Sequence, residues 1–310
     1  MSSSADTRKV VLITGCSQGG IGHSLSRKYA EANCIVYATA RRVHAMAGLP
    51  EAGVRTLQLD VTNAEEIQSV VQTVISEQGR IDVLVNNAGI CMCSPVLDQD
   101  LNEARRLFDT NVWGALALTQ AVAPHMCRRR SGCVVNMGSI TPLAHIPWHA
   151  TYGAAKAALH HYSDTLRREL APFNVNVSLV VAGFIQSEIV QKSIDTIGLK
   201  DDSLYKPREN YIAQTIELAH HLHATSTDVF AQGLVKKTLC ANPPYAYYTA
   251  RLSTAYWVME FLPRSVVDWG ITFGLDTYGE IRRGELPASK LIGFVLFLAA
   301  IVGLIAWATL

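Results

Sequence analysis

Residues 9–22 read KVVLITGCSQGGIG, in which an apolar run ends in a cluster of glycines. The run VVLIT predicts a buried β-strand, and residues 21–33 have the apolar spacing of an amphipathic helix. Glycines between the two allow a tight turn and a close approach of a ligand to the backbone. A strand, a glycine-rich turn and a helix in this order are typical of sites where a helix N-terminus binds phosphate. The stretch therefore predicts the first unit of a nucleotide-binding α/β fold.

Strands and helices continue to alternate along the chain to about residue 252. Apolar runs predict further strands at residues 34–40, 54–61, 81–89, 132–139, 174–183 and 243–251, with helices at residues 64–78, through residue 111 and around residue 152. The strands are apolar throughout, which is typical of a parallel sheet covered by helices on both faces. The predicted fold class is therefore α/β, with a doubly wound, Rossmann-like parallel sheet.

The last 20 residues, 291–310, read LIGFVLFLAAIVGLIAWATL and contain no charge. A helix of this length spans about 30 Å, the thickness of the hydrocarbon core of a bilayer. Arg282, Arg283 and Lys290 precede it and no cation follows, so the positive-inside rule places the larger domain in the cytosol. The segment predicts a C-terminal transmembrane helix, with a buried core helix as the alternative.

These patterns divide the chain into four predicted regions. They are a polar leader (1–8), a Rossmann-like catalytic domain (9–252) with a substrate lid at about 185–241, an apolar and aromatic extension (253–288), and a transmembrane tail anchor (289–310). The extension suits a protein core and a membrane surface equally well.

Composition excludes several classes of function. A net charge of +1 gives no electrostatic basis for nucleic-acid binding. The seven cysteines are odd in number and lack CxxC spacing, which predicts reduced thiols rather than disulfides or metal ligands. The histidines at 220, 221 and 223 favour an exposed helix end over a metal site, because no carboxylate or cysteine set accompanies them. No metal is expected.

Two pairs of side chains indicate chemistry. Tyr152 and Lys156 are four residues apart in a predicted helix, so they share one face, and the ammonium is expected to lower the pKa of the phenol. Tyr152 would then be a usable acid or base. Arg41 and Arg42 follow the second predicted strand where NAD-binding folds carry an acid, which predicts recognition of a 2′-phosphate and hence NADP(H).

Together these features resemble the short-chain dehydrogenase/reductase family over residues 8–252. The glycine turn resembles that family's TGxxxGxG with one residue inserted, residues 86–89 match its NNAG, and Asn111, Ser139, Tyr152 and Lys156 match its catalytic tetrad in order. The resemblance implies cofactor contacts at Thr14, Gly15, Ser17, Gly20, Ile21, Gly22, Arg41, Arg42, Asp60, Val61, Asn87, Tyr152, Lys156, Gly183, Ile185 and Ser187.

The resemblance also implies a role for each member of the tetrad. Tyr152 would give a proton to a carbonyl oxygen as hydride arrives from the nicotinamide, and Ser139 would polarise that oxygen. Lys156 would lower the pKa of Tyr152 and bind the nicotinamide ribose, and Asn111 would hold a water that relays protons. In the family's PG position the chain has Ala182–Gly183, which is expected to loosen that loop.

The substrate is the least determined feature. Within the family, the glycine turn, residues 37–42 and the C-terminal extension look most like fungal NADPH-dependent reductases of 1-acyl-dihydroxyacetone phosphate, which implies the endoplasmic reticulum or lipid droplets. Lys192, Lys200, Lys206 and Arg208 could meet a phosphate or be merely solvated. A reductase of a steroid, retinoid or secondary-metabolite ketone is the alternative enzyme, and a membrane-bound NADP(H)-binding scaffold is the non-enzymatic one. A lipase site at Ser17 lacks a placed His/Asp pair, and a homo-oligomer is left open.

Overall fold

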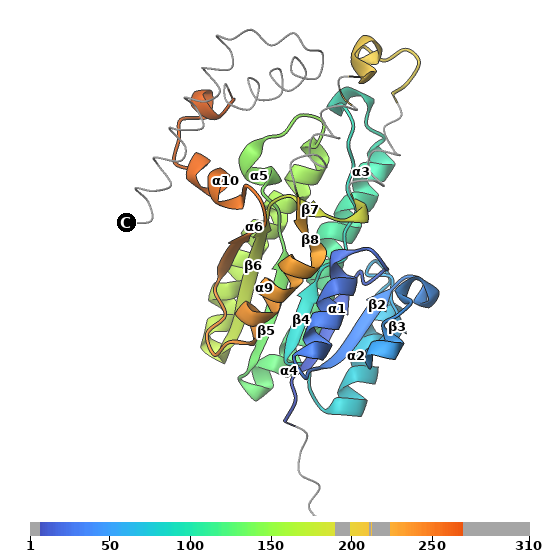
Figure 1. Cartoon of the computed structure of the whole chain (residues 1–310), viewed down its shortest axis with the longest axis vertical. Coiled ribbons are helices and arrows are strands. Elements are labelled where there is room, and N and C mark those ends of the chain that lie inside the picture. The colour runs from blue at the N-terminus through green and yellow to red at the C-terminus, as the bar shows by residue number, and fades with distance from the viewer. Residues whose placement is uncertain (1–6, 190–198, 211, 213–223, 269–310) are drawn as a thin grey trace, which may run out of the picture.

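The computed structural model describes residues 7–189, 199–210, 212 and 224–268. At its centre is a parallel seven-stranded sheet in the order β3-β2-β1-β4-β5-β6-β9 (Figure 1). Its strands are β1 (Val10–Thr14), β2 (Ile35–Ala40), β3 (Arg55–Gln58), β4 (Val83–Asn86), β5 (Gly132–Met137), β6 (Val175–Ala182) and β9 (Ala246–Thr249). A second, two-stranded parallel pair joins β7 (Ile185–Gln186) to β8 (Thr225–Ser226).

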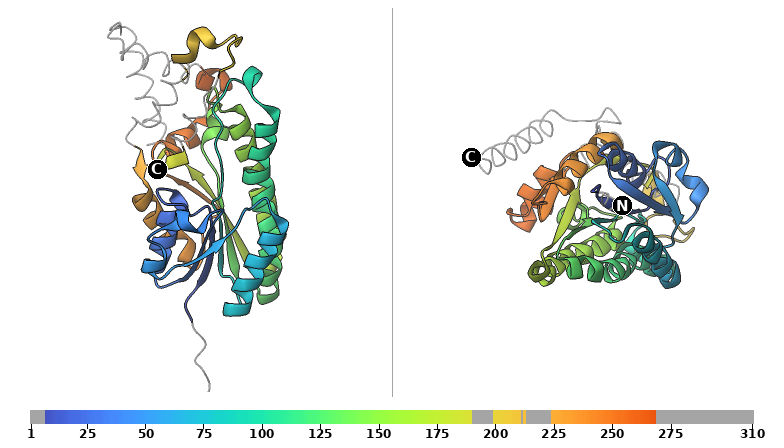
Figure 2. Two further views of the ribbon diagram at one scale, coloured as in Figure 1. Left: turned by 90° about the vertical axis from the view of Figure 1, so that its right-hand side faces the viewer. Right: turned by 90° about the horizontal axis from the view of Figure 1, so that it is seen from below.

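Helices cover both faces of the sheet (Figure 2). The helices are α1 (Ile21–Glu31), α2 (Ala64–Gln78), α3 (Leu101–Phe108), α4 (Gly114–Arg129), α5 (Thr141–Ala144), α6 (Ala150–Leu170), α9 (Thr227–Leu239) and α10 (Ser253–Met259). α1 and α9 lie on one face, and α2, α4 and α6 lie on the other. The predicted doubly wound α/β fold is confirmed.

Strand β1 shows how the two layers are built. Val11 and Ile13 point into the core beneath α1 and α9, whereas Val10 and Leu12 point into the core beneath α2 and α4. Because successive side chains of a strand face opposite sides, an unbroken apolar run can fill both cores at once. This is why the predicted strand reads as a continuous apolar segment.

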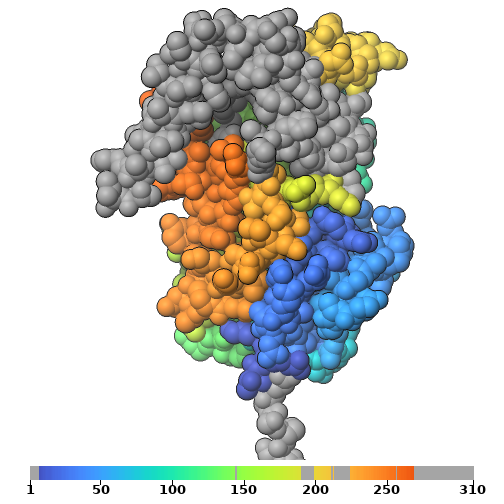
Figure 3. Space-filling model, viewed as in Figure 1, coloured from blue at the N-terminus to red at the C-terminus, as the bar shows by residue number. Residues whose placement is uncertain are grey.

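Helix α9 differs from the sequence-based expectation. It lies within residues 185–241, where the lid was expected, yet Phe230, Leu234 and Val235 are buried in the core shared with α1. The two helices lie against each other on the surface of this face (Figure 3), and the buried Tyr29 hydroxyl bonds Thr238 Oγ1 at 2.5 Å. Residues 227–239 therefore belong to the helical layer of the domain. A substrate lid stays a prediction only for residues that precede α9.

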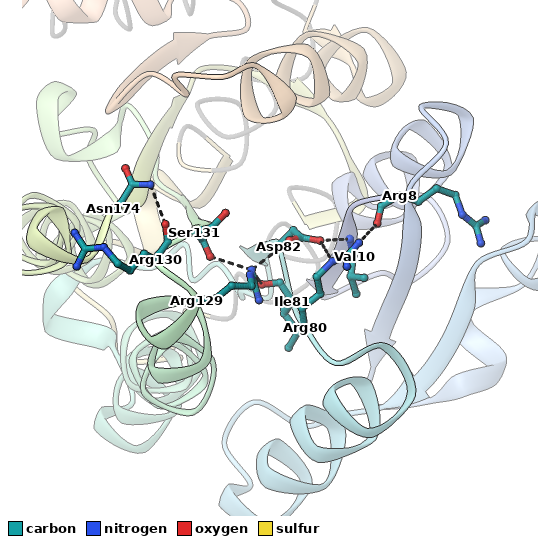
Figure 4. Close-up of polar contacts among 9 residues, drawn as sticks. All are labelled: Arg8, Val10, Arg80, Ile81, Asp82, Arg129, Arg130, Ser131 and Asn174. Carbon is teal, nitrogen blue, oxygen red and sulfur yellow. Dashed lines mark hydrogen bonds and ion pairs between the residues drawn. The ribbon is translucent and has the colours of Figure 1, made fainter. Parts of the chain in front are cut away.

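A network around Asp82 closes the amino-terminal edge of the sheet (Figure 4). Its carboxylate accepts hydrogen bonds from the backbone N of Val10 at 2.7 Å, from Arg80 Nε at 3.0 Å and from Arg129 Nη2 at 3.2 Å. These partners come from the start of β1, the turn before β4 and the end of α4. The network fixes the end of the sheet opposite to the end where the loops leave the strands β1, β4 and β5.

The C-terminal part is described only to residue 268. α10 packs on β9 and α5, and Val258 and Val267 are buried, while Phe261 is 73% exposed. The start of the predicted extension therefore packs on the domain that contains the sheet. The uncharged segment 291–310, Lys192 and the histidines at 220, 221 and 223 lie outside the described residues. Within the described part of the chain, no helix has the length and apolar character needed to cross a bilayer.

Candidate active site

The predicted site residues gather at the carboxyl-terminal edge of the sheet. Strand order reverses between β1 and β4, because the chain passes from β1 outward to β2 and β3 and then returns to β4. In open parallel sheets this switch point leaves a crevice outside the strand ends, where ligands bind. The glycine turn after β1 and the NNAG turn after β4 flank it.

The glycine turn requires its glycines. Gly15 has φ +72°, and a Cβ there would lie 2.8 Å from Ala88 Cα. A Cβ on Gly22 would lie 2.5 Å from the Gly15 carbonyl oxygen. The turn ends at Gly20, the N-cap of α1, which has no side-chain cap, and the first turn of α1 carries no acid. Uncapped N–H groups without a neighbouring carboxylate suit a bound phosphate.

Thr14 joins the two turns. Its Oγ1 accepts hydrogen bonds from the backbone N of Asn87 at 3.0 Å and of Ala88 at 2.9 Å, and donates to Val85 O at 3.3 Å. In return, Asn87 Nδ2 donates to Thr14 O at 2.8 Å and to Gly15 O at 3.1 Å. Thr14 and Asn87 therefore tie the glycine turn after β1 to the NNAG turn after β4.

A buried amide chain extends this bracing to the helices. Asn86 Nδ2 donates to Thr119 Oγ1 on α4 at 3.0 Å and to Asn136 Oδ1 on β5 at 2.8 Å. Asn136 Nδ2 then donates to Ser163 Oγ on α6 at 2.9 Å. The chain links β4 and β5 to α4 and to α6, the helix that carries Tyr152 and Lys156.

Asn111 lies in a π-helical turn, Asp109–Trp113, which joins α3 to α4. The turn interrupts the long helix that the sequence predicts here. Both ends of the Asn111 amide bind residue 90, because Oδ1 accepts from Ile90 N and Nδ2 donates to Ile90 O, each at 2.8 Å. The side chain therefore holds the loop that follows NNAG, and the expected water relay stays a prediction.

Tyr152 and Lys156 project from the first turns of α6 into one buried space. Lys156 Nζ lies 5.6 Å from the centre of the Tyr152 ring. Lys156 is 6% exposed, and its Nζ donates to Met137 O at the end of β5 at 2.7 Å. The predicted common face of the two side chains is confirmed.

The pKa of Tyr152 does not follow the sequence-based expectation. Burial raises it above its ordinary value, the charges of Cys91 and Cys93 add to the rise, and a hydrogen bond with Ser139 opposes it. The expected lowering by Lys156 is not observed, because the ammonium donates to a carbonyl instead of the phenol oxygen. Burial also lowers the pKa of Lys156 to about 8. The resting phenol is therefore firmly protonated.

Ser139 is held by a residue that the sequence analysis missed. His160 Nε2 accepts a hydrogen bond from the backbone N of Ser139 at 3.2 Å. Burial, reinforced by the charge of Lys156, lowers the pKa of His160 to about 4, so the ring is neutral and can accept. The available signal was its spacing, since His160 is four residues after Lys156 on the same helix.

The Ser139 hydroxyl is oriented by its partners. Its Oγ accepts from Thr141 N at 3.2 Å and from Thr141 Oγ1 at 3.1 Å. Two accepted bonds leave its own O–H to donate toward Tyr152 or toward a carbonyl oxygen. The site thus combines a protonated phenol, an oriented hydroxyl and a buried ammonium, a set able to polarise and protonate a carbonyl.

The residues after β2 and β3 lie at the other side of the glycine turn. Arg41 and Arg42 directly follow β2, both are exposed, and neither forms an ion pair with another described residue. Asp60 Oδ1 accepts from Thr62 N and Oγ1, at 3.0 and 2.7 Å, so it shapes a turn. Val61 is buried and packs against α4.

The loop after β6 is fixed rather than loose. Gly183 N donates to Thr249 O at 2.9 Å, Phe184 N donates to Arg251 O at 3.1 Å, and a Cβ on Gly183 would lie 2.1 Å from Arg251 O. Ile185 and Ser187, which follow, are buried. The missing proline does not loosen this loop, because main-chain bonds to the segment after β9 hold it.

Known proteins resemble this chain in sequence and in fold. A family model described as short chain dehydrogenase matches residues 9–198. The short-chain dehydrogenase ptmH of Penicillium ochrochloron is 37% identical over 263 residues, which cover 84% of this chain and 96% of that protein. The NADPH-dependent 1-acyldihydroxyacetone phosphate reductase of Schizosaccharomyces pombe is 38% identical over 213 residues, 67% of this chain and 72% of that protein. The closed form of serine dehydrogenase complexed with NADP+ has a TM-score of 0.69 at 25% identity, and the match covers 79% of this chain and 95% of that chain.

Replacing Thr14 by valine tests the bracing of the crevice. Thr14→Val keeps the shape but removes the acceptor for the Ala88 and Asn87 N–H groups, so the free energy of unfolding in urea should fall by about 1–3 kcal/mol. Thr39→Val is the matched control, because Thr39 is equally buried on β2 but only donates one bond, to Ile13 O. It should cost about 1 kcal/mol or less. Equal losses in the two variants would contradict the special role of Thr14.

Proposed function

The chain belongs to the short-chain dehydrogenase family of oxidoreductases, and we propose that it is an NADPH-dependent reductase of a hydrophobic ketone. The observation that carries the proposal is the grouping of Ser139, Tyr152 and Lys156. They lie at the carboxyl-terminal ends of the central strands, where the glycine turn also lies. A phenol that stays protonated is suited to give a proton, which is the requirement of reduction.

The residues around the crevice fit NADP(H). The tight glycine turn and the uncapped N-terminus of α1 would hold the pyrophosphate, and Arg41 and Arg42 would bind the 2′-phosphate through their planar guanidinium groups. No acid follows β2 until Glu51. The NADPH-dependent relative from S. pombe and the NADP+ complex of serine dehydrogenase support the same choice. The cofactor, when bound, supplies a hydride.

The protein supplies the proton and holds the oxygen that receives it. The Ser139 hydroxyl donates a hydrogen bond to the ketone oxygen and polarises the carbonyl. Tyr152 gives its phenolic proton to that oxygen and becomes a phenolate; with the hydride that the cofactor would supply to the carbonyl carbon, the ketone would become a secondary alcohol. The Lys156 ammonium, held near the ring by Met137 O, stabilises the new negative charge.

The preferred substrate is 1-acyl-dihydroxyacetone phosphate, reduced to 1-acyl-glycerol 3-phosphate. The S. pombe relative that is named for this substrate supports the choice. Lys200 and Arg208 offer exposed cations for a phosphate in the described segment 199–210, whereas Lys206 is paired with Glu209 at 3.2 Å. A reductase of another hydrophobic ketone uses the same tetrad and remains the alternative.

The uncharged segment 291–310 would anchor the protein in a membrane with the catalytic domain on the cytosolic side. A single-chain lipid ketone resides in a bilayer, so an anchor would hold the active site beside its substrate. The expected membrane is the endoplasmic reticulum or the lipid droplet surface.

Replacing Tyr152 by phenylalanine tests the chemistry and the substrate together. NADPH oxidation by the detergent-solubilised full chain should be rapid with the acyl phosphate, and Tyr152→Phe should lower kcat by about a hundredfold or more, because the proton donor is lost. NADPH binding, followed by fluorescence, should persist in the variant. Near-normal turnover by Tyr152→Phe would disprove the mechanism. If the chain reduces steroid ketones and not the acyl phosphate, the substrate assignment is wrong but the proposed mechanism stands.

Lys156 predicts the pH dependence of reduction. As pH rises through about 8, the ammonium loses its proton and no longer stabilises the phenolate, so kcat/KM for reduction should fall. Stability should change in the opposite direction. Between about 8 and 10.5 the unfolded lysine binds a proton that the folded one does not, so unfolding free energy rises with pH relative to Lys156→Met. A rate that stays level to pH 10 would contradict this role of Lys156.

Two lysines placed in the uncharged segment test the anchor. Phe297→Lys and Ile301→Lys together should release the chain from membranes during alkaline extraction, because each lysine at the centre of a span costs about 2.5–3.5 kcal/mol. The wild-type chain should stay in the membrane pellet. If the wild-type chain is extracted as readily as the double variant, residues 291–310 do not anchor it.

A further inference from the structure

Two cysteines and one histidine lie together at the N-terminus of α6. Cys91 and Cys93 follow the NNAG turn, and His149 is the N-cap of α6. The Sγ atoms and an imidazole nitrogen all lie within 4.8 Å of one another, and Cys93 Sγ is 3.0 Å from His149 Nε2. A main-chain hydrogen bond from Ser94 N to Trp148 O, 2.8 Å long, ties the two segments together.

The histidine is oriented as a ligand. His149 Nδ1 lies 3.0 Å from Pro147 O, and a carbonyl can only accept, so Nδ1 carries the hydrogen. The lone pair is then on Nε2, which lies 3.0 Å from Cys93 Sγ. Metal-bound histidines have the same arrangement, in which a backbone carbonyl fixes the tautomer and the ring.

We propose that Cys91, Cys93 and His149 bind a zinc ion. Zinc binds thiolate sulfur at about 2.3 Å and imidazole nitrogen at about 2.0 Å, in a tetrahedron. The three ligand atoms of such a site must lie close together, and those of Cys91, Cys93 and His149 lie within 4.8 Å of one another. Two sulfurs disfavour magnesium and calcium, which prefer oxygen. Three protein ligands leave a fourth position for water or another small ligand, as in catalytic and regulatory zinc sites.

A bound ion would join the loop after β4 to the start of α6. Gly153 N donates to His149 O at 2.7 Å in the first turn of α6, which also carries Tyr152. Ile90 and Met92, the neighbours of Cys91, pack in the same cluster as Tyr152. Zinc would therefore fix two segments beside Tyr152, the loop after β4 and the first turn of α6. The inference depends on this geometry and not on the identity of the ketone.

Cobalt is the probe, because Co²⁺ replaces Zn²⁺ and reports its ligands by absorption. The reduced, metal-free full chain should bind one Co²⁺ with a thiolate-to-cobalt charge-transfer band and tetrahedral d–d bands, and Zn²⁺ should displace it. Cys93→Ser should weaken binding by about a hundredfold or more. Cys91→Ser, at a less buried position, should do the same if Cys93→Ser fails to fold.

Matched controls separate this site from other ligands in the chain. Cys240→Ser, at an exposed thiol, and His145→Gln, at an exposed histidine just before α6, should keep the full spectrum. Replacing the histidines at 220, 221 and 223 by glutamine should leave the thiolate band unchanged, since imidazole alone does not produce it. The proposal is overturned if the reduced wild-type chain shows no thiolate band. It is also overturned if Cys91→Ser and Cys93→Ser both bind Co²⁺ as tightly as the wild-type chain. Neither readout requires turnover, so failure of the reductase proposal would leave this test intact.

Discussion

The site depends on the buried hydroxyl of Thr14, which ties the glycine turn after β1 to the NNAG turn after β4. It accepts from Asn87 N and Ala88 N while Asn87 Nδ2 bonds the turn after β1. The turns that leave two neighbouring strands carry backbone groups outside the strand ladder, and these groups need partners. The polar side chains of Thr14 and Asn87 supply them. Gly15 can then approach Ala88 closely, because it carries no Cβ.

Burial sets the protonation states around the tetrad. The low-dielectric interior disfavours charge, so the pKa of Tyr152 rises, that of Lys156 falls to about 8 and that of His160 falls to about 4. The tyrosine therefore holds its proton, and the histidine stays a neutral acceptor for the Ser139 main chain. The pKa of Lys156, about 8, lies within the range where a modest rise in pH removes its proton. The carbonyl of Met137 positions its charge where a phenolate would form.

The candidate site residues come from several elements. Ser139 follows β5, Tyr152 and Lys156 lie on α6, and Asn111 lies in the π-helical turn before α4. The amide chain from Asn86 to Ser163 braces β4 and β5 against α6. Family membership settles that the chain is an oxidoreductase, whereas a fold does not name a substrate.

The sequence by itself determined the succession of strands and helices along the chain and the parallel sheet, because periodicity is a local property. Its motif spacing also supplied the predicted tetrad. It also placed Tyr152 and Lys156 on one helix face. Only the tertiary structure decided that α9 is a core helix, that Lys156 bonds Met137 O, that His160 supports Ser139 and that Cys91 and Cys93 meet His149. Cys93 and His149 are 56 residues apart, so no spacing rule within one segment could pair them. Burial, which sets the pKa values, likewise arises only when distant segments pack together.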